Sequence, residues 1–346
     1  MKTLKRLTYA IAAVVMTVTF VGCHEIEEFD NNGRGNFEQL WTLFDEHYCF
    51  FKEKGVDWDS VYAEYAPKAA DCKSYEQLFG VCSDMLAELK DGHVNLSSWF
   101  NTFYYRDWWS AYPQNFNERV IEQNYLSFDY RQLGPVIFDV LQQNIGYMRI
   151  DNFESGLGDS NMTAILNHMA MCNGLIIDVR DNGGGSMTNV ETVVSRFIKR
   201  KTLVGYIMHK TGPGHDDFSE PYAYYYAPPD GALVWSKPVA VLCNRSTFSA
   251  ANNFVSVMKL LPNVTVIGAT TGGGSGMPMS YELACGWGVR MSASPVLDAE
   301  GNGTEFGVDP TDGFEVGITA MDTAAGRDPI IDKAVALLSG LLTGVE

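Results

Sequence analysis

The segment Gly174–Gly185 reads GLIIDVRDNGGG, and it decides the fold class of this chain. Its first half is a run of apolar residues without polar alternation, which is typical of a strand buried on both faces of a sheet. Its second half is a glycine turn. The segment Val239–Asn252 reads VAVLCNRSTFSAAN and repeats this arrangement, with Ser249 in the turn. Because α/β enzymes place backbone N–H groups and reactive side chains where such strands end, we expect the chemistry at these two turns.

The chain around these segments alternates strands and helices. Strands are predicted at 145–153, 174–179, 202–209, 239–242, 264–267 and 288–291, and helices near 162–171, 188–199, 250–260 and 329–341. The segment 211–235, with its tyrosine-rich stretch at 222–226, predicts an aromatic hairpin or lid. The fold class is therefore α/β (α+β), a mixed β-sheet flanked by helices.

The N-terminal part follows a different pattern, because its apolar residues recur at helical spacing up to about residue 90. We interpret it as a small domain of about three helices that ends near His93. The expected divisions are a signal peptide at 1–22, a tether at 23–35, a helical domain at 36–97, an aromatic-rich connecting region at 98–143 and the core at 144–346. About 320 residues after the signal, in a chain that is 46% hydrophobic, can bury a large core.

The first residues predict export and lipidation. A basic start (Lys2, Lys5 and Arg6) precedes the apolar stretch Leu7–Val21, which is short for a membrane span. The stretch ends at Cys23 in a pattern that resembles a bacterial lipobox, so we expect a lipid on Cys23 that anchors the chain in a bacterial cell envelope. An ordinary signal peptide with an incidental cysteine is the alternative. The sequence leaves open whether the protein faces the periplasm or the cell surface.

Charge and composition exclude several classes of partner. Removal of residues 1–22, which hold three bases and no acid, lowers the formal net charge from −17 to −20, so nucleic acid is not an expected partner. The glycine runs 183–185 and 272–274 are not followed by the Lys-Ser/Thr of a phosphate-binding loop. We expect no cofactor and no metal, since the histidines and the remaining cysteines lack ligand spacing. A disulfide between Cys72 and Cys82 is left open.

Four segments together resemble the core of the C-terminal processing (tail-specific) proteases, and of the tricorn branch of that family. Asp178–Gly185 is similar to the family's D-L-R-x-N-x-G-G turn, and Ser246–Ala251 to its nucleophile turn. Ile145–Phe153 resembles the strand that opens the core, and Glu305–Pro310 the element that closes it. Many relatives carry a PDZ domain before the core, but about fifty residues between His93 and this strand are too few for one.

The resemblance implies the identity of the site residues. Ser249 would be the nucleophile, with the N–H groups of Ala250 and of Gly184 or Gly185 as the oxyanion hole. The larger branch uses a lysine about 25 residues after the serine, but residues 270–276 contain none. The tricorn-like branch uses a histidine and a supporting acid instead, which would be His93 and Glu305.

Several alternatives remain open at this point. Ser246 is a competing hydroxyl, Asp309 a competing acid, and Ser249 could act only as a helix N-cap. Two positions depart from the relatives: Gly92 stands where the tricorn pattern has a serine, and Asn252 where many relatives have a glutamate.

The sequence therefore predicts a lipid-anchored serine endopeptidase of the Ser-His-Glu type that acts on peptides or proteins. The alternative is a peptide-binding envelope lipoprotein that has the same fold and little or no catalytic activity. The sequence determines neither the substrate nor the oligomeric state.

Overall fold

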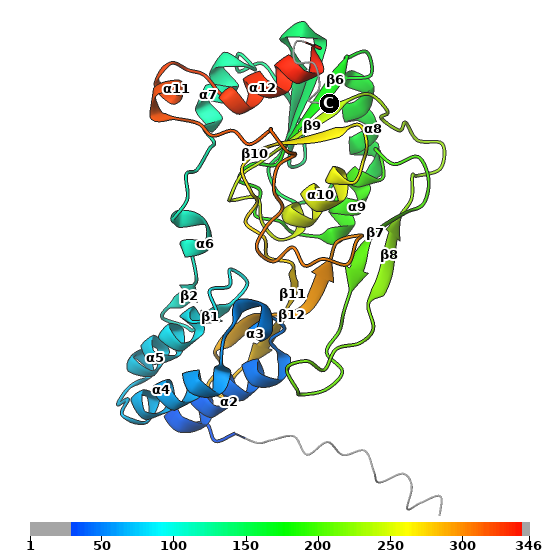
Figure 1. Cartoon of the computed structure of the whole chain (residues 1–346). Helices are drawn as coiled ribbons and strands as arrows, with labels where there is room; N and C mark the ends of the chain where they lie inside the picture. The colour runs from blue at the N-terminus through cyan, green and yellow to red at the C-terminus, as the bar shows by residue number, and fades with distance from the viewer. Residues whose placement is uncertain (1–28, 341–346) are drawn as a thin grey trace, which may run out of the picture.

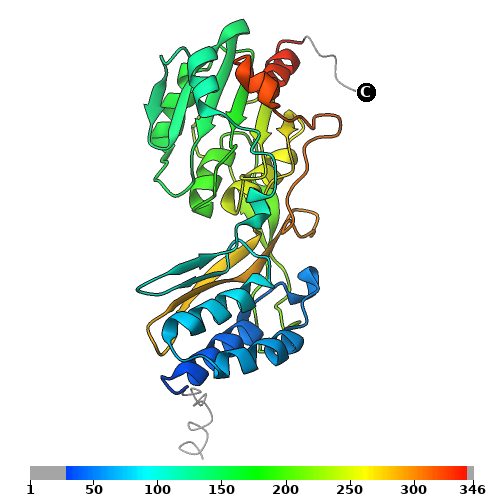
Figure 2. The same cartoon turned by 90° about the vertical axis from the view of Figure 1, so that its left-hand side faces the viewer.

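The structure, a computed structural model, describes residues 29–340 and has two lobes (Figures 1 and 2). The sheet of the upper lobe has the strand order β10-β9-β6-β5-β4-β3. Four of these strands run parallel to one another: β5 (Ile145–Ile150), β6 (Gly174–Asp178), β9 (Val239–Cys243) and β10 (Val264–Gly268). The hairpin of β3 (Arg131–Leu133) and β4 (Val136–Leu141) extends the sheet in antiparallel fashion.

Helices cover both faces of this sheet, as the uninterrupted apolar strands require. Leu175 and Ile177 of β6 pack with α8 (Asp159–His168), α9 (Met187–Val194) and α10 (Ala250–Lys259). Ile176, between them, faces the opposite cluster. That cluster contains α7 (Glu118–Asn124) and α12 (Pro329–Leu338). Short helices α6 (Asp107–Ser110) and α11 (Ala320–Ala324) and the 3₁₀ turn η1 (Gln142–Asn144) lie in the connections.

The lower lobe contains the N-terminal helices and one end of a second sheet of order β2-β1-β12-β7-β8, in which β11 also pairs with β12. The other end of this sheet reaches the upper lobe, where Val204 of β7 and Tyr226 of β8 belong to the hydrophobic core of the first sheet. The helices are α2 (Gly33–His47), α3 (Phe51–Lys54), α4 (Trp58–Ala70) and α5 (Tyr75–Ala87). The strands are β1 (Asn95–Ser97), β2 (Thr102–Tyr104), β7 (Thr202–Ile207), β8 (Tyr222–Tyr226), β11 (Gly276–Glu282) and β12 (Gly288–Leu297).

The long strand β12 connects the two parts of this sheet. Its first residues pair with β1, and Val296 and Leu297 pair with β7. The turn before it places Leu283 and Trp287 in the hydrophobic core of the N-terminal helices. The helical lobe is thus completed by residues from far along the chain, which helical periodicity alone does not reveal.

The six predicted strands and four predicted helices of the core are all present, with ends shifted by a few residues. The tyrosine stretch forms β8, which pairs with β7 as an antiparallel hairpin. The prediction missed β11 and the full length of β12. Within residues 29–340 the six cysteines are free thiols, and no group of side chains has the composition of a metal site. No helix in that range has the length and apolarity of a bilayer span. The signal peptide and Cys23 lie outside the described residues.

Candidate active site

Ser249 occupies the sharp turn between β9 and α10. Its backbone has φ 58° and ψ −122°, a combination that residues other than glycine seldom adopt. Such strain costs about 1–3 kcal/mol and persists where the surrounding structure imposes it. The Ser249 N–H donates to the carbonyl oxygen of Gly273 at 2.8 Å, which helps to hold the turn. This is the geometry of a nucleophile elbow, in which a strained strand-to-helix turn exposes a serine hydroxyl.

The glycine turn after β6 lies directly against Ser249. A Cβ on Gly184, whose φ is +101°, would lie 2.8 Å from the Ser249 Cβ and 2.9 Å from the Ala250 nitrogen. At Gly185, with φ +138°, a Cβ would lie 2.2 Å from the backbone of Phe153. Both positions require glycine, because a side chain would push the turn away from the serine.

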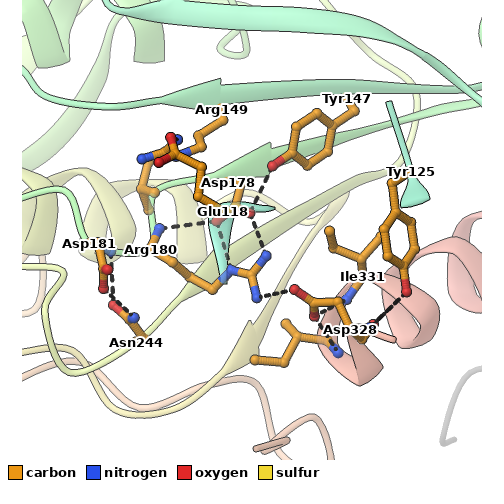
Figure 3. Close-up of polar contacts among 12 residues, drawn as sticks. Glu118, Tyr125, Tyr147, Arg149, Asp178, Arg180, Asp181, Asn244, Asp328 and Ile331 are labelled. Carbon is orange, nitrogen blue, oxygen red and sulfur yellow. Dashed lines mark hydrogen bonds and ion pairs between the residues drawn. The ribbon is translucent and has the colours of Figure 1, made fainter. Parts of the chain in front are cut away.

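A buried ion network supports this turn (Figure 3). The Arg180 guanidinium donates to both carboxylate oxygens of Asp178, at 2.9 and 2.6 Å, and to Asp328 at 2.8 Å. The Tyr147 hydroxyl donates to Asp178 at 3.0 Å, and Asp328 also caps the start of α12. The Arg180 charge is thus paired with two buried carboxylates, so the aspartate and arginine of the family motif serve structure here rather than chemistry.

Asn182 connects the turn to the neighbouring strand and engages one predicted oxyanion donor. Its Oδ1 accepts from the N–H of Gly184 at 2.9 Å, and its Nδ2 donates to the Ile150 carbonyl at 2.9 Å. Among the hydrogen bonds of residues 29–340, none uses the N–H of Gly185 or Ala250. The sequence predicted either Gly184 or Gly185 as an oxyanion donor. Because its N–H is not engaged, Gly185 is the one that can donate to an oxyanion.

His93 comes from the turn between α5 and β1 and reaches Ser249 from the other lobe. Its Nε2 lies 2.9 Å from the Ser249 Oγ, although 156 positions separate the two residues. This is the distance over which a general base removes a hydroxyl proton. The structure thus brings the predicted nucleophile and base together.

Asp91 holds the turn that carries His93, and the sequence analysis did not single it out. The residue is 1% exposed. One oxygen accepts from the backbone N–H of His93 at 2.7 Å, and the other accepts from the hydroxyls of Tyr48 and Ser292, both at 2.9 Å. The sequence signal that could have identified Asp91 is its position, two residues before the histidine at the end of a predicted helix.

The environment keeps the His93 imidazole neutral. Burial lowers the pKa of His93 to about 4; the charge of Asp91 opposes this shift, and those of Arg290 and Lys54 add to it. Near pH 7 the ring is therefore unprotonated, as a general base must be. Its Nδ1 is buried without a hydrogen-bond partner.

Glu305 belongs to the same buried cluster but pairs with a different residue. Its Oε1 lies 2.9 Å from Lys54 Nζ, and its Oε2 accepts from the Ser275 N–H at 2.8 Å. None of the hydrogen bonds found across residues 29–340 joins Glu305 to His93. Burial and the charge of Asp91 raise the pKa of Glu305 to about 7, against the effect of Lys54.

These groups are linked through their charges. Asp91 and Lys54 act on the pKa of both His93 and Glu305. Burial opposes the ammonium charge of Lys54, but Glu305 and Asp91 raise its pKa above the ordinary value. Asp309, the competing acid, is exposed and accepts a hydrogen bond from Thr270 at 2.6 Å. Lys54, in the N-terminal helices, has no sequence signal that connects it to the site.

Trp108 explains the departure at Gly92. A Cβ at position 92 would lie 2.6 Å from the Trp108 Nε1 and 2.9 Å from the Phe248 ring. Trp108 stacks on Phe248 with ring centroids 4.1 Å apart, and Phe248 packs against His93 at 4.7 Å. A serine therefore has no room at position 92 while Trp108 is in place.

Asn252, the second departure, has a structural role. Its Oδ1 accepts from the Thr271 hydroxyl at 2.6 Å, and its Nδ2 donates to the Thr304 hydroxyl at 3.1 Å. The residue is fully buried and both ends of its amide are paired. Asn252 thereby links α10 to the two segments that contain Thr271 and Thr304.

Two cavities flank the serine and histidine. One, of about 280 Å³, is lined by Ser249, Ala250 and Gly185 and by residues of α9, α10, β11 and β12. The other, of about 430 Å³, lies between the lobes, with Gly92, Trp108, Phe248 and Glu305 among its lining residues.

The comparisons with known proteins agree with this geometry. Residues 144–312 match the model of peptidase family S41, residues 29–87 match the tricorn protease C1 domain, and no PDZ domain is found. The crystal structure of a provisionally assigned peptidase from Parabacteroides merdae is 47% identical, covers 91% of this chain and 98% of its own, and gives a TM-score of 0.85. This chain belongs to peptidase family S41. It is thus a member of the tail-specific family of serine-type peptidases.

Other relatives in this family are more distant. Tricorn protease homolog 1 of Streptomyces coelicolor is 32% identical over 167 residues, which are 47% of this chain and 14% of that protein. The chloroplastic carboxyl-terminal-processing peptidase 2 of Arabidopsis thaliana is 26% identical over 152 residues, 43% of this chain and 28% of that protein. The alignments thus span less than a third of these curated relatives. Mature CPAF shares the fold over 91% of this chain and 99% of its own, at 14% identity and a TM-score of 0.68.

Proposed function

We propose that this S41 family member is an endopeptidase that uses Ser249 as nucleophile and His93 as general base. The observation that carries the proposal is the 2.9 Å contact between His93 Nε2 and Ser249 Oγ at a strained strand-to-helix turn. A serine hydroxyl becomes a useful nucleophile only when a neighbouring base accepts its proton. The lowered pKa of His93 keeps that base unprotonated at neutral pH.

The reaction would follow the acyl-enzyme course. His93 removes the hydroxyl proton while Ser249 attacks the peptide carbonyl, and the imidazolium then gives the proton to the leaving amine. The N–H groups of Ala250 and Gly185 stabilise the oxyanion. Loss of one such donor costs about 2.7–4 kcal/mol of transition-state stabilisation. Water, activated by the same histidine, then releases the acyl group.

The buried acids stabilise the imidazolium through their charge. In this proposal Glu305 remains the supporting acid of the Ser-His-Glu set, and it acts together with Asp91 and under the control of Lys54. Asp91 raises the pKa of His93 directly, and Asp91 and Lys54 also act on the pKa of Glu305, so the proposed acid shares the electrostatic environment of the base. Asp91 has the additional task of holding the backbone of His93.

We also propose that the enzyme is anchored in a bacterial cell envelope through a lipid on Cys23. This part rests on the sequence pattern that ends at Cys23. The formal charge of −20 after removal of residues 1–22 favours peptide or protein substrates over nucleic acid.

A peptide-binding lipoprotein without catalysis is the less favoured alternative. A fold retained only for binding has no use for a strained serine in contact with a neutral histidine. The available N–H of Ala250 beside that serine also favours the enzyme.

Labelling by a fluorophosphonate, together with cleavage of a fluorogenic peptide mixture, tests the proposal. Ser249→Ala should abolish both, with a fall in turnover of about 10⁴–10⁶, and leave the melting temperature nearly unchanged. Ser246→Ala is the matched control, because it removes a hydroxyl from the same turn, and it should retain labelling. Labelling lost in Ser246→Ala but kept in Ser249→Ala would move the nucleophile, and full activity in both would remove serine catalysis from this site.

A further inference from the structure

The turn between β1 and β2 presents two adjacent aromatic side chains to solvent. Trp99 is 69% exposed and Phe100, the next residue, is 37% exposed. Of the seven tryptophans, all of which lie within residues 29–340, Trp99 is the one that is largely exposed. Contiguous apolar surface of this kind usually marks a contact with a partner. We call Trp99 and Phe100 the aromatic tip.

The turn holds the aromatic tip in a defined position. The Ser98 N–H donates to the Asn101 carbonyl oxygen at 2.8 Å, and the Ser98 Oγ accepts from the Asn101 N–H at 3.0 Å. Behind the tip, the Tyr75 ring lies edge to face with Trp99, with centroids 5.8 Å apart. Because these contacts exist before any partner binds, contact with a partner costs little ordering of the turn.

The aromatic tip lies close to the point where the described chain begins. The strands β1 and β2 and the helix α2 all belong to the lower lobe (Figures 1 and 2). Asn31 and Asn32 line a surface hollow together with Tyr75, which contacts Trp99. Cys23 precedes Asn31 by eight positions, and eight residues span at most about 28 Å. A lipid on Cys23 would therefore keep a bilayer surface within reach of the tip.

We propose that the aromatic tip docks on the phospholipid bilayer that holds the Cys23 anchor. A tryptophan ring suits the boundary between headgroups and acyl chains, because most of it is apolar while its N–H is polar. The inference rests on the part of the proposed function that places a lipid on Cys23. This second contact would fix which side of the lower lobe faces the bilayer, and with it the direction from which a peptide reaches Ser249.

The contact is apolar rather than electrostatic. Residues 97–105 carry no charge, and the formal net charge without residues 1–22 is −20, so anionic headgroups repel the chain as a whole. Docking at low salt should therefore be strongest on phosphatidylcholine and weaken as phosphatidylglycerol replaces it. Stronger docking on phosphatidylglycerol would overturn the aromatic contact, since it requires a basic surface.

Quenching by brominated lipid tests the contact. The full chain, processed by a bacterial host, is reconstituted in phosphatidylcholine vesicles with or without bromine on the upper acyl carbons. Bromine should lower the tryptophan fluorescence, and Trp99→Phe should abolish this loss without affecting the fold, because the side chain is mostly exposed. Trp109→Phe is the matched control, since it removes a half-buried tryptophan of α6, and it should keep the loss. Quenching that persists in Trp99→Phe would overturn the proposal.

Phe100→Ser keeps the fluorophore but reduces the apolar contact. Because 37% of Phe100 is left to bury, the docking equilibrium should fall about two- to fivefold, which is read as reduced quenching of Trp99. Phe128→Ser removes a phenylalanine that follows α7 and is 60% exposed, and it should leave the quenching unchanged. Equal effects of the two serine variants would count against the tip. If Phe100→Ser does not fold, Trp99→Phe still decides.

The outcomes separate the docking from the anchor and from the peptidase. Mass spectrometry of the same samples shows whether Cys23 is acylated. Acylated protein without quenching would overturn the docking and leave the anchor, whereas unacylated protein without quenching would overturn both. Quenching of unacylated protein would support the docking and refute the anchor. Dimerisation that Phe100→Ser abolishes would assign the tip to a second copy of the chain and overturn the proposal. Fluorophosphonate labelling of Ser249 does not enter these judgements.

Discussion

Restoring the serine that the tricorn pattern has at position 92 should damage this enzyme. Gly92 precedes His93, the proposed general base, and lies against Trp108. The Cβ of a serine there would come within 2.6 Å of the Trp108 Nε1, 2.9 Å of the Phe248 ring and 3.0 Å of the Trp108 Cδ1. Real Cβ atoms do not approach other heavy atoms so closely, so either Trp108 or the turn must move.

Both movements have a cost that the structure allows us to estimate. If Trp108 rotates away, the stacked pair with Phe248 is lost, and such a pair contributes about 0.5–1.5 kcal/mol beyond its buried area. If the turn moves, the 2.9 Å contact between His93 and Ser249 lengthens, and a misplacement of about 1 Å can cost 10²-fold in rate. Overpacking of this kind typically costs about 1–3 kcal/mol. We therefore expect Gly92→Ser to lower the free energy of unfolding by about 1–3 kcal/mol and kcat/KM by about 10- to 100-fold.

The assay is a double-mutant cycle with Trp108→Ala, read by urea unfolding and by kcat/KM on one peptide. Trp108→Ala opens the space, so the serine should cost at least about 1 kcal/mol less in the double variant than alone. Gly80→Ser is the matched control, because an added Cβ at that exposed glycine of α5 has no neighbour within 4 Å. Wild-type activity and stability in Gly92→Ser, or strictly additive effects in the cycle, would refute the steric explanation.

Two further predictions concern the base and the anchor. Because burial lowers the pKa of His93 to about 4, kcat/KM should rise with pH through an apparent pKa below the ordinary 6.5 and be flat near neutrality, whereas a rise above pH 8 would indicate a lysine base. His93→Ala should remove the rise and nearly all turnover, and wild-type activity in that variant would end the Ser–His assignment. Cys23→Ala should leave an unprocessed, unacylated precursor, which mass spectrometry of the membrane fraction detects; normal maturation and acylation would contradict the lipidation proposal.

The core of the fold was accessible from the sequence because its strands have a strong local signal. The strand β6 is apolar at consecutive positions, and the structure buries Leu175 and Ile176 against opposite helical layers. Which segments belong to which lobe was harder to predict from the sequence. Trp287 lies 200 positions after the helices whose core it completes, and helical periodicity carries no information about a partner that distant in the chain.

The same difference between local and distant signals decides which site residues the sequence could predict. Ser249, Ala250 and the glycines lie in short motifs in which each residue is placed by its immediate neighbours, so a local pattern can identify them. The pKa of His93 depends on charged groups from three separate segments, which are Lys54, Asp91 and Arg290. The sequence pointed to Glu305 as the acid, but only the three-dimensional structure shows that its carboxylate pairs with Lys54 and that Asp91 holds the backbone of His93. A motif can indicate which side chains are present, but charge balance in a buried cluster is a property of the whole set, because Asp91 and Lys54 each act on the pKa of both His93 and Glu305.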